Sequence, residues 1–236
     1  MALLQETWPQ ISPDLASQFA RDGFLIIREF ATRETCEAIR ASILDFTRRE
    51  ELIRVRWPQS TFDTFNSSQV DENFPGLSDL YDRHLLEQLL HLSRLPLATV
   101  ADRRVGLSIN LTSIGGKFEP HFDRHILTAI LYVNDDYTGG EMMLFPRVRY
   151  WLGHPAGRLQ RRLQRVLDRL TRDRNYLRWF AKKKTLKPNR GDLLIFEGTK
   201  TYHAVTPVGT GSTRLSIQFA YDKPGMMFDV SGYYGK

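Results

Sequence analysis

The sequence predicts a mainly β fold, a jelly roll with flanking helices, and three observations lead to this expectation. Two groups of short apolar strands, separated by Gly, Pro and Asn-Asp turns, occupy residues 104–146 and 188–222. Helical patterns fill the first hundred residues, and a basic stretch at 147–187 separates the two strand groups. With 236 residues and 42% apolar content, the chain is long enough for a substantial core. We therefore expect a single domain over 1–236, in which residues 1–100 support the jelly roll.

The N-terminal part carries helix and strand signals in alternation. A Ser-Pro-Asp start signal predicts a helix over 12–22, and a short apolar run predicts a strand at 24–27. Thr32 predicts the cap of a second helix, which should end near residue 51, and apolar periodicity predicts another helix at 79–92. The intervening residues 54–78 carry turn signals and predict an irregular segment, either a substrate-covering loop or a surface crossover.

The two strand groups supply the predicted jelly roll. We expect strands at about 104–114, 117–123, 126–133 and 141–145, and again at 192–196, 201–206 and 213–222. In the last of them, alternation places Arg214, Ser216 and Gln218 on one face and apolar residues on the other. An arginine that faces inward is costly to bury unless it meets an anion, and its planar fork suits a carboxylate. The pattern therefore indicates an anion-binding role for Arg214.

The amino-acid composition excludes several classes of protein. The single cysteine, Cys36, excludes an internal disulfide and a cysteine-based metal cluster, and its helical setting predicts a buried structural thiol. The sequence contains no run of about eighteen apolar residues, so it predicts no membrane-spanning helix. Its first residues also lack the basic start and apolar core of a signal peptide. We therefore expect a cytoplasmic location.

One motif indicates a metal site. His121 and Asp123 are two residues apart, so on a strand their side chains point to the same face. An imidazole and a carboxylate of this kind are two of the three ligands of a facial triad that leaves positions on non-haem Fe(II) open. The third ligand should be a histidine on another strand, and His203 lies on the predicted strand 201–206.

The other histidines fit this role less well. His84 and His91 lie seven residues apart on a predicted helix, where no Asp, Glu or Cys shares their spacing, and we expect them on the helix surface. His125 is four residues past His121, a spacing that would suit zinc on a helix. Its β-rich surroundings place it in a strand exit loop, where we consider a contact with substrate.

Five motifs occur in a fixed order between about residue 110 and residue 222. They are Gly115-x4-Pro120-His121-x-Asp123; Leu127-x-x-Ile130-Leu131-Tyr132-Val133-Asn134-Asp135; Gly139-Gly140-Glu141; Pro188-x-x-Gly191-Asp192-Leu193; and His203-Ala204-Val205 followed by Arg214 and Ser216. Together they resemble the Fe(II)/2-oxoglutarate-dependent dioxygenases, in particular the prolyl-4-hydroxylase-like branch. The resemblance implies a double-stranded β-helix, the jelly roll of this family.

The resemblance also implies cofactors and roles. His121, Asp123 and His203 look like the iron ligands, and Arg214 looks like the partner of the distal carboxylate of 2-oxoglutarate. Ser216 completes an Arg-x-Ser pair, and Tyr132 stands where the family often has a second carboxylate donor. The implied enzyme is a hydroxylase that uses Fe(II), 2-oxoglutarate and O2 to oxidise an unactivated C–H, with succinate and CO2 as co-products.

Two positions refine this implication. Thr112 stands where many prolyl hydroxylases have tyrosine, so the resemblance does not imply a prolyl substrate. The related halogenases have a small residue at the position of Asp123, to admit chloride. The intact carboxylate therefore favours hydroxylation over halogenation.

The stretch between the strand groups is strongly basic. Residues 147–184 hold thirteen Lys and Arg against two acidic residues, whereas the whole chain has 33 against 27. Leucines recur at three- and four-residue steps, which predicts an amphipathic basic helix. It could simply pack on the sheet with a solvated back. The alternative is a surface for a polyanion, with Arg161, Arg162 and Arg165 on the helix and Trp179 as an aromatic anchor at its flank.

The aromatics of this stretch lie at its ends and do not interleave with the cations, which favours a membrane interface over nucleic acid. We therefore predict peripheral association with the inner face of a membrane. As substrate we predict an anionic, membrane-bound glycolipid sugar, as for the Kdo hydroxylases that modify lipopolysaccharide. The alternative is a peptidyl-prolyl or free amino-acid hydroxylase. A sensor that binds metal or 2-oxoglutarate without turnover, or a zinc hydrolase, is less favoured, since the latter would leave Arg214 without a purpose.

Overall fold

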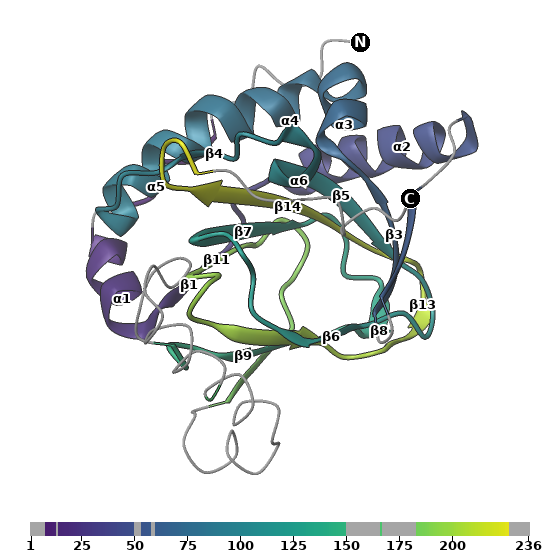
Figure 1. Ribbon diagram of the computed structural model, residues 1–236. Coiled ribbons are helices and arrows are strands. Elements are labelled where there is room, and N and C mark those ends of the chain that lie inside the picture. The colour runs from purple at the N-terminus through teal and green to yellow at the C-terminus, as the bar shows by residue number, and fades with distance from the viewer. Residues whose placement is uncertain are drawn as a thin grey trace.

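The computed structural model describes residues 8–12, 14–49, 53–57, 60–149, 166 and 183–226. Two antiparallel sheets face each other, and helices cover the outer face of the larger one (Figure 1). The helices are α1 (Asp14–Asp22), α2 (Arg33–Arg49), α3 (Ser67–Asn73), α4 (Pro75–Asp79), the π-helical turn η1 (Leu80–His84), α5 (Leu85–Ser93) and α6 (Arg103–Gly106).

Fourteen strands lie within the described residues. They are β1 (Phe24–Ile27), β2 (Ile53–Trp57), β3 (Ser60–Phe65), β4 (Ala98–Thr99), β5 (Leu107–Thr112), β6 (Phe118–His121), β7 (Leu127–Tyr132), β8 (Tyr137–Gly139), β9 (Met142–Phe145), β10 (Lys184–Leu186), β11 (Leu193–Phe196), β12 (Tyr202–Val205), β13 (Val208–Gly211) and β14 (Arg214–Asp222). The major sheet has the order β1-β11-β7-β14-β5-β3-β2, with β4 paired to β14, and the minor sheet has the order β10-β9-β12-β6. Strands β13 and β8 form a third, two-stranded sheet. The predicted jelly roll is confirmed.

Strand alternation divides the interior into two apolar regions. On β14, Leu215, Ile217 and Phe219 face the helices and join the larger core between helices and major sheet. A smaller apolar cluster lies between the two sheets and includes Tyr132, Leu194 and other residues of β7, β9, β11 and β12. The face of β14 that carries Arg214 and Ser216 therefore looks into the space between the sheets, as the sequence pattern predicts.

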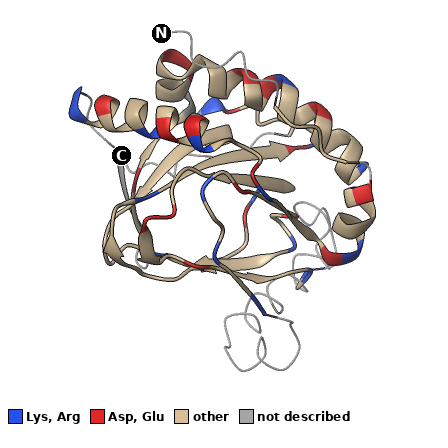
Figure 2. Ribbon diagram, turned by 180° about the vertical axis from the view of Figure 1, so that it is seen from behind, with Lys and Arg blue, Asp and Glu red and all other residues tan. Residues whose placement is uncertain are grey.

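The N-terminal support elements form where the sequence places them. The Thr32 hydroxyl accepts a hydrogen bond from the Thr35 N–H at 3.1 Å, which confirms the predicted cap of α2. Cys36 on that helix is completely buried, as expected. Strand β1 pairs with β11, with Phe24 opposite Phe196, and extends the major sheet. Both acidic and basic residues are interspersed along the helices (Figure 2).

Three local predictions are wrong. The strand predicted from about residue 104 begins at Leu107, because residues 103–106 form helix α6. The described residues of 54–78 are not irregular, because they belong to the antiparallel strands β2 and β3 and then to α3 and α4. The turn signals there separate short elements, and β3 becomes a strand by pairing with β5, which lies more than forty residues further along the chain. The strand predicted over 117–123 ends at His121, so Asp123 lies in the loop that follows β6.

Most of the predicted basic helix at 147–187 lies outside the described residues. At its end, residues 184–186 are strand β10, paired with β9, so the minor sheet resumes before residue 188. Arg161, Arg162, Arg165 and Trp179 are all outside the described residues, and their predicted roles stay predictions. Among the described helices, none combines the length and the apolar character that crossing a membrane requires.

Candidate metal and co-substrate site

The minor sheet brings the two predicted histidine ligands together. His121 is the last residue of β6, and the antiparallel register places it directly opposite His203 on β12. Asp123 does not lie on the strand, contrary to the prediction. The chain leaves the strand after His121, and the Asp123 N–H donates to the Gly198 carbonyl at 3.2 Å. This loop contact, and not strand alternation, turns the carboxylate toward the two imidazoles.

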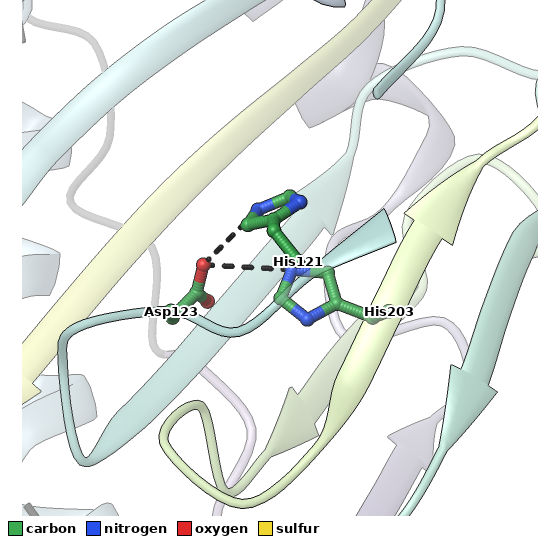
Figure 3. A group of neighbouring side chains, drawn as sticks. All are labelled: His121, Asp123 and His203. Atoms are coloured by element: carbon green, nitrogen blue, oxygen red, sulfur yellow. Dashed lines mark ion pairs between the residues drawn. The ribbon is translucent and has the colours of Figure 1, made fainter. Parts of the chain in front are cut away.

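The three side chains converge on one point (Figure 3). Asp123 Oδ1 lies 3.4 Å from His121 Nε2 and 3.5 Å from His203 Nε2. One ligand atom from each residue falls within 4.8 Å of the others, and no other group of three potential ligands forms among the described residues. Adjacent ligands at ~2.1 Å from one metal ion are about 3 Å apart, so a small inward movement suffices to share an ion. The donor set fits Fe(II) with open positions.

Hydrogen bonds behind the three side chains fix their orientation. His121 Nδ1 donates to the Glu119 carbonyl at 2.6 Å, and His203 Nδ1 donates to the Thr201 carbonyl at 3.1 Å. Both rings therefore present Nε2 to the centre. Partners of this kind fix the tautomer and orientation of a metal-binding histidine.

The protonation states of His203 and Asp123 suit a cation. Burial lowers the pKa of His203 to about 4, and the nearby His121 ring acts in the same direction. Burial also acts to raise the pKa of Asp123, but His203, His121 and the Thr128 hydroxyl more than offset it and hold that pKa well below its usual range. At neutral pH, His203 is therefore a neutral ligand and Asp123 is an anion.

Asp123 has a further partner on the major sheet. The Thr128 hydroxyl on β7 donates to Asp123 Oδ2 at 2.6 Å, while Oδ1 faces the histidines. The sequence analysis missed Thr128, although it shares the inward face of β7 with Ile130 and Tyr132. The period-two pattern could have identified it.

The predicted co-substrate residues form a second polar cluster between the sheets. Arg214 is 1% exposed, and it donates from Nη1 to the Ser216 hydroxyl at 3.1 Å. Its guanidinium carbon lies 5.1 Å from the centre of the Tyr132 ring. Within the described residues it has no carboxylate partner, because no ion pair includes it.

Buried polar atoms at this cluster lack hydrogen-bond partners. Arg214 Nε, the Tyr132 hydroxyl and the Thr112 hydroxyl make no hydrogen bond within the described part of the chain. Burial raises the pKa of Tyr132 to about 12, although Arg214 acts against it, so the phenol keeps its proton as a donor. One cation and these donors fit a carboxylate, since buried polar groups otherwise nearly always have partners.

A cavity of about 100 Å³ connects the two clusters. Its lining includes His121, Asp123, His203, Arg214 and Ser216, so a metal ion and a small dicarboxylate would share one space. Pockets that enclose a whole drug-sized ligand measure roughly 300–1,000 Å³. A large substrate would therefore insert only its reacting group.

The comparison with known families decides the class of protein. Residues 107–222 match the model of the 2OG-Fe(II) oxygenase superfamily, and this range contains the three converging residues and Arg214. The chain carries a 2OG-Fe(II) oxygenase domain. It is a 2-oxoglutarate-dependent oxygenase, and its cofactors are Fe(II), 2-oxoglutarate and O2.

Solved structures support the fold of this oxygenase. The epimerase SnoN from nogalamycin biosynthesis is 18% identical, with a TM-score of 0.67 over 92% of this chain and 91% of that chain. A Pseudomonas putida prolyl-4-hydroxylase is 17% identical, with a TM-score of 0.59 over 90% and 99%. HygX from Streptomyces hygroscopicus, with nickel and 2-oxoglutarate bound, is 14% identical, with a TM-score of 0.63 over 92% and 89%. At these identities the similarity establishes the fold alone. No curated protein matches the chain.

The histidines that we did not expect to bind the metal lie outside the ligand cluster of the oxygenase. His84 is exposed on η1, where its Nε2 is 3.1 Å from Asp79, and His91 is exposed on α5. His125 is 5% exposed, borders the cavity, and has its Nδ1 3.7 Å from Asp222 Oδ2. A contact between His125 and substrate stays a prediction.

Proposed function

We propose that His121, Asp123 and His203 hold Fe(II), and that Arg214, with Ser216 and Tyr132, binds the distal carboxylate of 2-oxoglutarate. The convergence of the three ligand atoms, within 4.8 Å of one another, is the observation that carries the proposal. The guanidinium of Arg214, which is buried and has no carboxylate partner among the described residues, supports the assignment of the 2-oxoglutarate site. The reaction is hydroxylation of an unactivated C–H, with succinate and CO2 as co-products, and the carboxylate of Asp123 favours it over halogenation.

The side chains of the protein orient the metal ligands and the co-substrate, and they keep water away from the reacting atoms. Bound Fe(II), with 2-oxoglutarate and O2, supplies an oxidant strong enough to remove hydrogen from an unactivated carbon. The Nδ1 hydrogen bonds keep both imidazoles turned inward, and Thr128 keeps one oxygen of Asp123 out of the centre. Arg214 would hold one end of 2-oxoglutarate, which would leave the other end free for the metal held by His121, Asp123 and His203. The apolar residues between the sheets, including Ile130, Met142 and Val205, limit the entry of water.

Anaerobic loading with Fe(II) and 2-oxoglutarate, followed by exposure to O2 and a succinate assay, tests the proposal. We expect slow succinate release even without substrate, and its loss in the His203→Ala variant. His91→Ala is the matched control, since that histidine is exposed on α5, a helix that contributes no residue to the cavity lining. Equal succinate release from wild type and His203→Ala would overturn the assignment of the iron ligand. Absence of release from loaded wild type would favour a binding protein without turnover.

For the substrate, the basic stretch 147–184 supports an anionic, membrane-associated glycolipid sugar such as Kdo. Charge reversal of Arg161, Arg162 and Arg165 should abolish sedimentation with vesicles that contain anionic lipid. Unchanged sedimentation would remove the basis for this substrate. The alternative, a peptidyl-prolyl or free amino-acid hydroxylase, predicts products that are heavier by one oxygen after incubation with candidate peptides.

A further inference from the structure

Three neutral polar side chains on the cavity wall have no hydrogen-bond partner within the described part of the chain. Ser108 and Asn110 on β5, and Gln218 on β14, all line the cavity. None of them makes a side-chain hydrogen bond to any residue that the structure describes. Asn110 is only 5% exposed, so bulk water does not solvate its amide freely. The polar atoms of the three side chains are not among the fully enclosed atoms that lack a partner, so they face the cavity, where a ligand can replace water.

The strand register gathers these side chains into one cluster. Ser108 pairs with Gln218 across β5 and β14, and Asn110 pairs with Ser216. Directly opposed side chains on one face have their Cβ atoms about 4.5–5.5 Å apart, and the next pair follows along the strands. The three side chains can therefore contact one bound group.

The cluster lies beside the path that 2-oxoglutarate would take. Gln218 is four residues beyond Arg214 on β14, which is about 13 Å of strand. The next inward residue, Ala220, pairs with Thr128, whose hydroxyl holds Asp123. Both polar ends of 2-oxoglutarate have partners in this arrangement, one at Arg214 and one at the metal ligands. Its middle is two methylene groups, which need no hydrogen bonds, so the polar cluster is available to another molecule.

The uncharged side chains of the three residues favour binding of a neutral substrate group over a charged one. Amide and hydroxyl side chains donate and accept hydrogen bonds but carry no charge. Among the described lining residues, Arg214 is the one Lys or Arg side chain, and 2-oxoglutarate would occupy it. A second carboxylate would meet no further Lys or Arg side chain among these described residues, and an unpaired carboxylate is costly in a buried site. The stacked rings of Phe62 and Phe118, 4.3 Å apart, add an apolar surface to the same lining.

We propose that Ser108, Asn110 and Gln218 bind a neutral hydroxyl- or amide-bearing group of the primary substrate, with its C–H face against Phe62 and Phe118. This inference rests on the proposed function, because it assumes that Arg214 and the metal ligands hold 2-oxoglutarate. It assigns the reacting end of the substrate to neutral sugars, polyols or cyclic amides. An anionic part of a larger substrate stays outside the cavity. The subsite therefore counts against Kdo as the reacting sugar, because Kdo carries its carboxylate on the sugar ring itself.

The test compares substrate-stimulated with unstimulated succinate release. Paired probes that differ by a carboxylate are methyl glucoside against methyl glucuronide, and N-acetylprolinamide against N-acetylproline. A cell extract, separated on an anion exchanger and treated with glycosidase to release sugars, adds a broad source. We expect neutral compounds to give the larger stimulation ratio. We also expect Ser108→Ala and Gln218→Leu to lower that ratio at least tenfold.

Control variants distinguish failure of the subsite proposal from failure of the proposed oxygenase function. Ser17→Ala and Gln18→Leu make the same replacements at exposed positions of α1 and should keep the wild-type ratio. Gln218→Glu preserves shape and adds charge, so it should also lose stimulation by neutral compounds if the fold is intact by circular dichroism. A ratio unchanged in Ser108→Ala and Gln218→Leu, stimulation by carboxylates alone, or no stimulation by any compound or fraction would overturn the subsite. Failure of the proposed function looks different, because wild type would then release no succinate at all.

Discussion

Arg214→Met should make the protein more stable and less active at the same time. Arg214 is buried, bonds to the Ser216 hydroxyl, and has no carboxylate partner among the described residues. A buried charge without a counter-charge costs several kcal/mol of folding free energy. Methionine has no charge and adapts its shape to the space.

The magnitude follows from two opposing contributions. Loss of the Ser216 hydrogen bond costs about 1 kcal/mol, and cavity water already reduces the penalty of the charge. We therefore expect the free energy of unfolding to rise by about 1–3 kcal/mol in the absence of ligand. For a chain of this length, that corresponds to a rise in Tm of roughly 2–12 °C. Loss of a buried charge pair with 2-oxoglutarate costs about 3 kcal/mol, or roughly a hundredfold in affinity.

Thermal unfolding of metal-free protein, with and without 2-oxoglutarate, measures the first effect, and the KM for 2-oxoglutarate in succinate release measures the second. Arg49→Met is the control, because Arg49 is exposed and pairs with Asp45 one helical turn away. We expect it to change stability by less than about 0.5 kcal/mol. A lower Tm for ligand-free Arg214→Met, with a KM within threefold of wild type, would refute the assignment of Arg214 to the co-substrate.

Three further changes have defined outcomes. Thr128→Val removes the hydroxyl that bonds Asp123, and calorimetric titration with Co(II) should show about 10–100-fold weaker binding, whereas an unchanged affinity would contradict the orienting role. Hydrogen bonds hold the pKa of Asp136 at about 2 despite some burial, so its stabilisation is complete above pH ~4 and is lost as pH falls toward 2. Because that side chain is 41% exposed, Asp136→Asn should flatten the acid limb of urea stability curves by less than about 1 kcal/mol, and a steeper limb would count against this account. Gly191→Ala should destabilise by about 2–4 kcal/mol in urea, since φ is +83° and a Cβ would lie 2.2 Å from the Ala31 carbonyl, and a wild-type midpoint would exclude this strain.

The local patterns of the sequence determined much of the site. Alternation in β14 correctly put Arg214 and Ser216 on the inward face, because the period of a strand is a property of the backbone itself. The spacing of His121 and Asp123, with a later histidine on its own short strand, was enough to predict a metal site. Helix caps such as Thr32 were equally readable, since a cap depends on a hydrogen bond between residues three apart.

Contacts between segments far apart in the sequence decided the features of the fold and the site that the sequence did not predict. The sequence named His203 as the third ligand but not the strand register that sets it opposite His121. It also did not indicate that Gly198 would position Asp123 or that β3 would pair with β5, because strand pairing depends on packing between residues far apart in the chain. The neutral wall of Ser108, Asn110 and Gln218 likewise exists only in the assembled sheet. Sequence alone therefore determined which chemical groups the protein carries and which face of a strand each occupies. The tertiary structure alone decided which of those groups meet, since the register between strands is set by the core that they bury together.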